Sequence, residues 1–332
     1  MTGQAAVTVI IPNYNGREFL KPCLATLERQ TCREFEILVV DNGSTDGSVE
    51  WLKDKGIPTI CLKENTGFSG AVNVGIRAAK TPYVLLLNND TQQEPRFVGE
   101  LLKAVRRSKK IFAVSSKMIQ LYDRELMDDA GDMYSVVGWA YQRGVGQSSA
   151  GYNRACQVFS ACAGAAIYRR EVFETIGYFD EKHFCYLEDI DVCWRAKIFG
   201  YHNMYCPTAV VYHVGSATSG SKYNEFKVRL AARNNIYLNY KNMPWPQLML
   251  NAVFLAAGIG VKYGFFKGIG FEKAYAAGVK EGFATMRSCQ KVVFHRKHLS
   301  NYLAIQWELL AGTAVYIYEF SRRKFLLNNH KA

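Results

Sequence analysis

Several common kinds of site are missing from this sequence of 332 residues. The nine cysteines are odd in number, and no two of them have the C-x-x-C spacing of a zinc or redox site. We therefore expect buried thiols in a reducing compartment. The sequence also has no P-loop pattern (G-x-x-x-x-G-K-S/T), no dinucleotide-binding G-x-G-x-x-G after its first strand, no internal repeat and no recognised nucleic-acid-binding motif.

Long apolar runs are scarce as well. The N-terminal stretch has no basic segment, and its apolar run is too short for a signal peptide, so we expect none. The longest apolar stretch, residues 248–261, is shorter than the roughly 20 residues that a membrane-spanning helix needs. We therefore predict no transmembrane segment, while an interfacial or re-entrant helix stays open.

Acidic residues are few in the C-terminal part. From Lys241 onward there are 13 Lys and Arg against 4 Asp and Glu, which carries most of the net charge of +12. A basic end rich in aromatic residues suggests an anionic partner, either nucleic acid or an acidic membrane surface. The overall content of 49% hydrophobic and 21% charged residues is typical of a globular protein.

The first 120 residues alternate between two periodicities. Apolar runs typical of strands lie at 7–11, 35–40, 57–62 and 83–89, and the segments between and after them favour helices at 18–30, 46–56, 67–80 and 95–108. This alternation predicts right-handed βαβ units and a mostly parallel sheet in an α/β fold.

After about residue 115 the alternation stops. Residues 122–155 are rich in Gly, Ser and Tyr, and we expect loops or a mobile flap there. Beyond them the pattern indicates a strand and a helix within 163–181, a helix at 188–200, a final strand at 208–213 and a helix at 224–242.

Polar residues follow the first two predicted strands. Tyr14 lies in the turn of "IIPNYNG" (10–16), and Asp41 follows the strand of "VVDNGSTDGS" (39–48). Ligands bind outside the carboxyl ends of strands in open α/β sheets. An aromatic ring beside a carboxylate suits a pyrimidine, which stacks and donates its imide N–H. The alternative is that these residues only cap turns and helices.

Glycines and amides follow the next two strands. Gly67 and Gly70 in "NTGFSGAVNVGI" (65–76) would let a backbone approach a phosphate, or would simply allow close helix packing. Asn88, Asn89 and Asp90 end the strand of "VLLLNNDTQQEP" (84–95). A carboxylate there can hold a divalent cation, which would in turn hold a diphosphate.

Two later motifs add a base and a ligand. The stretch "YLEDIDVCWRA" (186–196) places Glu188, Asp189 and Asp191 within four residues, where mutual repulsion favours a raised pKa and a general base. The alternative is a solvated helix N-terminus that carries acids. His213, at the end of "VVYH", is either a polar residue of a turn or a metal ligand.

The ordered series of these motifs resembles the family 2 glycosyltransferases, which have the GT-A nucleotide-diphospho-sugar-binding fold. "LNND", "GYFDE", "EDIDVCWRAKIFGY", "VVYHVG" and "RNNIYL" are similar to the rhamnosyltransferase branch, which also includes galactofuranosyltransferases. The resemblance covers about residues 5–240. It implies a GT-A domain at 1–240, with a nucleotide-binding half at 1–115 and an acceptor half at 116–240, followed by a basic helical extension at 241–332.

The resemblance also implies roles for individual residues. Asp189 matches the family's catalytic base. Asp90 matches the last acid of its D-x-D metal motif, in which Asn88 stands where Asp is common, and His213 matches a metal ligand of related enzymes. The nucleotide-sugar site would comprise Pro12, Asn13, Tyr14, Asp41, Ser44, Gly70, Asn73, Asn88 and Asn89. The acceptor side would involve Glu188, Asp191, Arg195 and Gly164.

The implied reaction is an inverting transfer assisted by Mg²⁺ or Mn²⁺. The first expectation is L-rhamnose moved from its dTDP donor onto a lipid-linked glycan, by an enzyme on the cytoplasmic face of the membrane. Helices at 262–275 and 318–325 would lie on the anionic leaflet. A galactofuranosyl or other hexosyl transfer from a UDP donor is the alternative. A sugar nucleotidyltransferase or a non-catalytic partner in glycan assembly is the alternative of another class. We expect no nucleic-acid partner, and homo-oligomerisation stays open.

Overall fold

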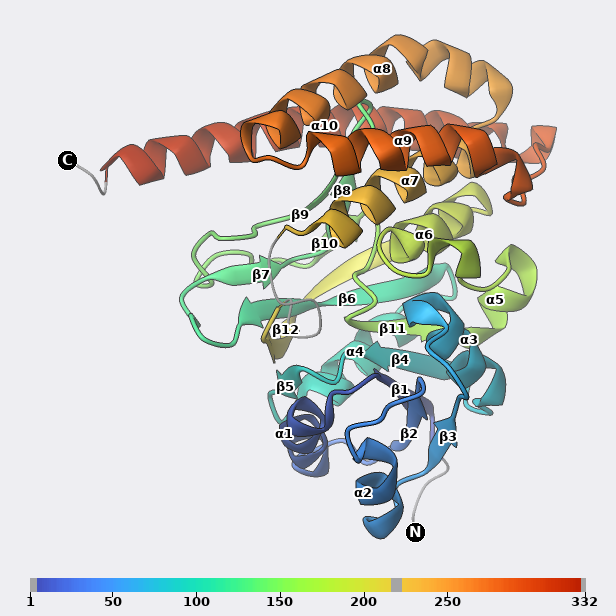
Figure 1. Cartoon of the computed structure of the whole chain (residues 1–332). Helices are drawn as coiled ribbons and strands as arrows, with labels where there is room; N and C mark the ends of the chain where they lie inside the picture. The colour runs from blue at the N-terminus through green and yellow to red at the C-terminus, as the bar shows by residue number, and fades with distance from the viewer. Residues whose placement is uncertain (1–4, 216–222, 330–332) are drawn as a thin grey trace.

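A computed structural model describes residues 5–215 and 223–329, with the side chains of 322–329 outside the description. A twisted sheet with helices on both faces forms the body, and the last helices lie together across one end of it (Figure 1). One of the two segments predicted to lie on the membrane is 318–325. The side chains of its residues 322–325 lie outside the description.

Within the described residues, ten strands form the main sheet, in the order β10-β12-β6-β11-β4-β1-β2-β3 with β5 paired to β12 and β7 to β6. The first half consists of the parallel strands β1 (Val7–Asn13), β2 (Phe35–Asp41), β3 (Thr59–Cys61) and β4 (Tyr83–Leu87). The other strands are β5 (Thr91–Gln93), β6 (Ile111–Gln120), β7 (Met127–Asp129), β10 (Cys156–Val158), β11 (Ala165–Arg169) and β12 (His202–His213). β11 runs antiparallel between β4 and β6, so the sheet is mixed rather than parallel throughout.

Alternating residues of the strands face two separate helical layers. Val7, Val9 and Ile11 of β1 pack on the side of α1 (Arg17–Glu28), α2 (Ser48–Asp54) and α4 (Phe97–Arg106). Ile10 packs on the opposite side with α3 (Gly67–Ala78), α5 (Arg170–Ile176) and α6 (Glu188–Ile198). Burial on both faces explains why these strands read as continuous apolar runs.

The sequence analysis did not predict the long strand β6. β6 is almost entirely buried although it contains Ser115, Ser116 and Lys117. Polar residues in its middle break the apolar run, and tertiary contacts satisfy them: the Lys117 ammonium donates to the Gly151 carbonyl and to Asn153 Oδ1. The expectation of loops over 122–155 was also incomplete, because β7 and the hairpin of β8 (Asp132–Tyr134) and β9 (Ala140–Gln142) lie there.

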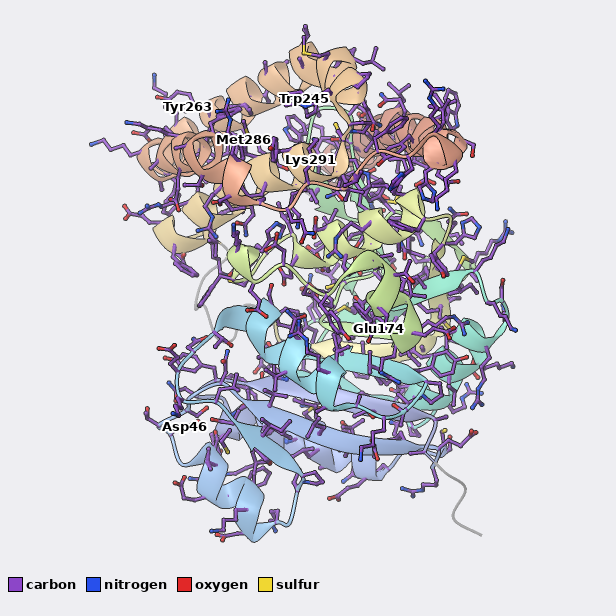
Figure 2. The ribbon with its side chains drawn as sticks, turned by 90° about the vertical axis from the view of Figure 1, so that its right-hand side faces the viewer. Asp46, Glu174, Trp245, Tyr263, Met286 and Lys291 are labelled. Carbon is purple, nitrogen blue, oxygen red and sulfur yellow. The ribbon has the colours of Figure 1, made fainter. Side chains whose placement is uncertain are left out.

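From residue 223 onward, the described residues contain four α-helices: α7 (Glu225–Asn242), α8 (Trp245–Gly268), α9 (Glu272–Thr285) and α10 (Leu299–Asn329). The predicted domain boundary at residue 240 falls in the last turn of α7. Figure 2 shows Trp245 and Tyr263 in this helical layer, at the opposite end of the molecule from Asp46.

The described residues contain one helix that is long and apolar enough to cross a membrane, namely α8. Its most apolar window has a mean hydropathy of 1.5, and only 11% of that window is buried. The apolar run at 248–261, which was too short by itself, is the middle of a 24-residue helix, so length alone no longer argues against a spanning segment. Apolar side chains are also exposed on α10, among them Leu303 and Trp307.

The C-terminal helices are bonded to the hairpin of β8 and β9. The Trp139 indole donates to the Gly258 carbonyl of α8 (3.1 Å), and the Tyr141 hydroxyl donates to the Gly312 carbonyl of α10 (2.6 Å). A Cβ at Gly258 would collide with the Val137 carbonyl, so glycine permits this close approach. The extension is therefore packed against the body of the protein.

Candidate active site

The ends of three strands share one buried polar network. The Asn89 amide, just past β4, donates to Asn13 Oδ1 at the end of β1 (2.8 Å). Asn13 in turn donates to Asp41 Oδ2 at the end of β2 (2.9 Å). These three side chains are each at most 7% exposed. The predicted meeting of polar residues at the carboxyl ends of β1, β2 and β4 is thus present.

The turn after β1 exposes an aromatic ring beside this network. Ser44 fixes the turn, because its hydroxyl accepts from the Asn15 backbone N–H (2.9 Å) and its own N–H donates to Asp41 Oδ1 (2.9 Å). Tyr14 is 37% exposed, and the preceding Pro12 is half-buried. Each carboxylate oxygen offers two acceptor positions, so Asp41 keeps acceptor capacity for a ligand.

A second cluster of polar side chains contains Asp90 and His213, which lies at the end of β12. His213 Nε2 lies 3.2 Å from Asp90 Oδ1, and Nδ1 lies 2.7 Å from Asp128 Oδ2. Burial lowers the pKa of His213, but hydrogen bonds to Asp128 and Asp90 outweigh it and raise that pKa to about 10. Carboxylate oxygens and an imidazole nitrogen are suitable donors for a divalent cation. With Nδ1–H bonded to Asp128, Nε2 would be oriented toward a metal.

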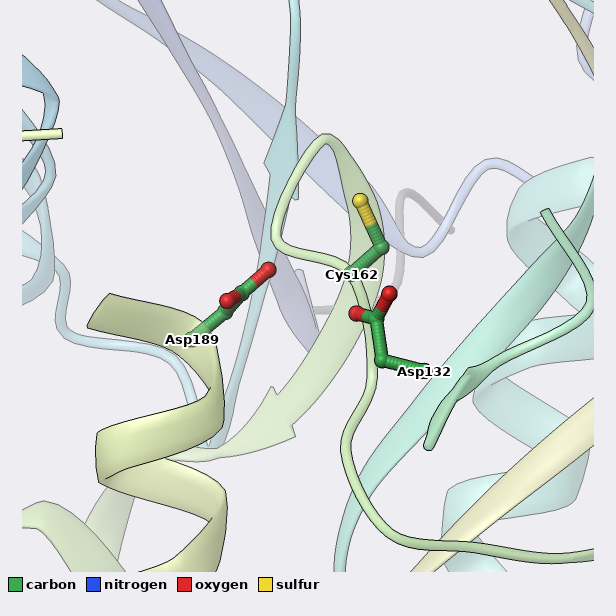
Figure 3. Close-up of side chains that lie close together, drawn as sticks. All are labelled: Asp132, Cys162 and Asp189. Atoms are coloured by element: carbon green, nitrogen blue, oxygen red, sulfur yellow. The ribbon is translucent and has the colours of Figure 1, made fainter. Parts of the chain in front are cut away.

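The predicted base faces two further side chains. The functional atoms of Asp132, Cys162 and Asp189 lie within 4.8 Å of one another, and Figure 3 shows the three side chains turned toward a common space. Asp189 accepts from the backbone N–H groups of Ile190 (2.8 Å) and Ala163 (3.3 Å). Burial nevertheless raises the pKa of Asp189 above its usual value. A carboxylate with a raised pKa is suited to accept a proton.

A close approach at Gly164 places the base beside the strand ends. The Asn88 backbone N–H donates to the Gly164 carbonyl (2.8 Å). A Cβ on Gly164 would lie 3.0 Å from Asn88 Nδ2 and 3.6 Å from Cys162 Sγ. Because Cys162 belongs to the Asp189 cluster and Asn88 adjoins Asn89 and Asp90, the two groups are neighbours. Glycine at this position lets the tip of β4 and the start of β11 meet.

Glu188 is buried beside the base. It is 7% exposed, and its Oε2 has no hydrogen-bond partner in the described part of the chain. Burial, followed by the charge of Asp189, raises the pKa of Glu188 to about 8. The carboxyls of Asp129 and Asp132 are also buried, and burial raises the pKa of both. Sequence reasoning missed Asp128, Asp129 and Asp132. The acids of "MDDAGD" (127–132) were the available signal.

An unusual loop sets the start of α6. Phe184, Tyr186 and Leu187 have φ angles of 62°, 73° and 68°, a region that non-glycine residues rarely adopt. The amide of Asn234, on α7, donates to the carbonyls of His183, Cys185 and Tyr186, each at 2.9 Å. Asn234 therefore holds the loop that leads into Asp189. The motif "RNNIYL" was noted in the sequence, but no role was assigned to this residue.

Two residues predicted on the acceptor side are structural instead. Asp191 is 0% exposed, and its carboxylate accepts from Arg195, Lys241 and Asn242. The guanidinium of Arg195 also donates to the carbonyls of residues 176–178. Burial raises the pKa of Asp191, but Lys241 and Arg195 outweigh it, so that pKa lies well below its usual range. With their polar atoms engaged inside the protein, neither residue is placed to touch an acceptor.

The expected phosphate site at the start of α3 is also corrected. Asn73 is 1% exposed, and its amide bonds to Phe179 and Glu181. A Cβ at Gly70 would meet Thr66 Oγ1 at 2.5 Å, so this glycine serves packing. The Ser69 N–H donates to the Phe184 carbonyl (3.2 Å), and the Gly67 N–H donates to Asn65. These first-turn donors already have partners in the protein.

The comparisons with known proteins agree with this geometry. The sheet and its helices are those of GT-A glycosyltransferases. A mannosyltransferase of Pyrobaculum calidifontis, solved with GDP-Man and Mn²⁺, matches with a TM-score of 0.53 at 17% identity, over 96% of this chain and 88% of that one. GalNAc-T7, solved with UDP, GalNAc and Mn²⁺, matches with a TM-score of 0.54 at 14% identity, over 72% and 51%. At such identities the likeness concerns the fold alone.

The sequence family follows from residues 8–177, which match the model of Glycosyl transferase family 2. This chain belongs to that family, and it is a glycosyltransferase. An N-acetylglucosaminyl-diphospho-decaprenol L-rhamnosyltransferase of Mycobacterium tuberculosis is 27% identical over 237 residues, 64% of this chain and 77% of that protein. An uncharacterized protein of Sinorhizobium fredii is 28% identical over 241 residues, 66% of this chain. The match covers only 26% of that longer protein.

Proposed function

We propose that this glycosyltransferase inverts the configuration of the transferred sugar and that Asp189 is its only general base. The carrying observation is the contact of Asn88 with Gly164, which sets the strand-end network and the Asp189 cluster side by side. A single displacement needs one proton acceptor on the face opposite the leaving group. Asp189, held by two backbone N–H groups and with a raised pKa, takes the proton of the acceptor hydroxyl.

The donor nucleotide is assigned to the turns after β1 and β2. The exposed ring of Tyr14 stacks on the base, Asp41 accepts its imide N–H, and Pro12, Asn13 and Ser44 shape the turn. Pyrimidine nucleotides, dTDP or UDP, fit a carboxylate that accepts from the base.

Asp90 and His213 would hold a divalent metal, Mg²⁺ or Mn²⁺, with Asn88 and Asn89 beside it. When bound, such an ion neutralises the departing diphosphate. Asp128 would orient His213 by accepting from its Nδ1. The position occupied by Asn88 supplies an amide oxygen in place of a carboxylate, so the site carries less negative charge than a D-x-D motif would.

Similarity to the mycobacterial enzyme supports L-rhamnose, from dTDP-rhamnose, as the sugar and a lipid-linked glycan as the acceptor. Galactofuranosyl or other hexosyl transfer from a UDP donor is the runner-up. The exposed apolar helix α8 and the basic C-terminal part support a position on the inner face of the membrane, at its anionic surface.

The deciding experiment offers the full chain a panel of nucleotide sugars, a divalent ion and an N-acetylglucosaminyl-diphospho-lipid. Release of one nucleoside diphosphate that depends on the acceptor identifies the donor. Asp189→Asn should leave donor affinity within about twofold and lower kcat by 10²–10⁴, the usual contribution of a general base. Asp54→Asn, an exposed acid on α2, serves as the matched control. Normal turnover by Asp189→Asn would show that the base is assigned wrongly.

A further inference from the structure

A cavity of about 160 Å³ lies between the catalytic body and the C-terminal helices. Its walls come from four helices or their ends: Leu187 before α6, Asn235 on α7, Lys262 and Phe266 on α8, and Tyr275 on α9. A cavity of this size accommodates a small group of heavy atoms, comparable to a benzene ring. None of the roles given above uses it.

Two polar side chains in the cavity wall lack partners. Lys262 is half-buried and Tyr275 is buried, and among the described residues neither the ammonium nor the hydroxyl forms a side-chain hydrogen bond or an ion pair. Tyr275 is 4% exposed, while its ring stacks on Phe266 at a centroid distance of 5.0 Å. Burial lowers the pKa of Lys262 to about 8. An ammonium with no counter-ion, in the same cavity wall as an unbonded hydroxyl, favours an anion as ligand.

The surroundings of Lys262 are apolar. Phe266, Tyr275 and Leu187 line the cavity with it, and Val261, Tyr263 and Phe265 are exposed beside it along α8. A purely ionic ligand would gain nothing from these surfaces. A molecule with an anionic head and a hydrocarbon chain could place its head on Lys262 and its chain along the apolar side chains of α8.

The cavity also adjoins the start of α6. Leu187 is the residue that caps this helix, directly before Glu188 and Asp189. A ligand bound at Lys262 therefore lies next to the element that carries the base.

We propose that this cavity binds the lipid diphosphate of the acceptor, with Lys262 and Tyr275 on its phosphate oxygens and the isoprenoid chain along α8. The proposal deepens the function proposed above and rests on it. It assigns the acceptor side of the enzyme to α7, α8 and α9, in place of the buried Asp191 and Arg195.

The test measures equilibrium binding of radiolabelled farnesyl diphosphate to the full chain in mild detergent. EDTA is present so that no metal holds the diphosphate at Asp90 and His213. Lys262→Gln should weaken binding about tenfold or more, the value of one charge-assisted hydrogen bond, and Lys262→Arg should restore most of it. Tyr275→Phe keeps the stacked ring and should weaken binding several-fold. Lys267→Gln, an exposed lysine of the same helix, should bind like the wild type.

Each other outcome overturns the assignment. Equal affinity of Lys262→Gln and Lys267→Gln would remove Lys262 from the site. Competition by inorganic diphosphate at the same concentration as farnesyl diphosphate would indicate a phosphate site without lipid, and equal competition by farnesol would indicate an apolar cavity alone. Thermal unfolding of each variant checks folding. If no nucleotide sugar is consumed by the wild type, the proposed function fails, while the farnesyl diphosphate measurements still decide the cavity.

Discussion

Asp191→Asn tests whether the third acid of "EDID" supports the fold or the chemistry. Its Oδ2 accepts from Arg195 Nη2 (2.9 Å) and Lys241 Nζ (2.9 Å), and Oδ1 accepts from Asn242 (2.8 Å). The amide retains one acceptor but removes the charge, and two buried cations lose their shared partner. Breaking a buried pair from one side costs about 3–5 kcal/mol of the free energy of unfolding.

Urea and thermal unfolding measure this loss. A domain stable by about 5–15 kcal/mol would remain folded but weakened, with Tm lower by roughly 5–15 °C. The pKa of Asp191 is lowered in the folded protein, so its contribution is present at neutral pH and is lost as pH falls below its unfolded value of about 3.9. The difference between variant and wild type should therefore shrink in acid.

Asp54→Asn, which removes an exposed acid, is the control here too. The unfolding of this variant should match that of the wild type. An Asp191→Asn protein with wild-type Tm and a raised KM for the acceptor would refute the structural role and restore the expectation made from the sequence.

Four further predictions follow, three on the site and one on the membrane contact. Asp90→Asn should weaken Mn²⁺-dependent donor binding about tenfold or more in calorimetry, and unchanged binding would remove Asp90 from the metal site. Asn234→Ala leaves three carbonyls of the loop before α6 without their donor; kcat should fall while donor affinity stays, and an unaltered kcat would argue against this positioning role. As pH falls through the raised pKa of Asp189, the base becomes protonated and kcat/KM for the acceptor should decrease, with a midpoint above 3.8; a flat profile down to pH 4 would contradict it. Trp307→Gln on α10 should reduce sedimentation with anionic vesicles, whereas equal sedimentation would exclude that side chain from the contact.

The first half of the sheet was predictable because its strands are buried on both faces and end abruptly in polar residues. Asn13, Asp41 and Asn89 follow such ends, and the parallel register brings them together. The antiparallel position of β11 was not predictable, since it depends on pairing with β6, whose apolar run is broken by Ser115 and Ser116.

The acids around the base could likewise be predicted from the sequence only in part. Asp189 stands in a recognisable motif, whereas Asp132 lies in a segment without periodicity and reaches the base only through the β8–β9 hairpin. Asp191 was assigned to the acceptor side together with Glu188. Its partners Lys241 and Asn242 are about 50 residues away along the chain, and no local pattern identifies them.

The β8–β9 hairpin has a consequence for how the enzyme would respond to its surroundings. At one end it carries Asp132 beside the base, and at the other it is bonded through Trp139 and Tyr141 to α8 and α10. The same short hairpin therefore connects those helices to the acid next to Asp189, so we expect a displacement of the helices by a bilayer or a second protein to be felt at that acid. Detergent extraction could thus alter turnover without any change at the nucleotide.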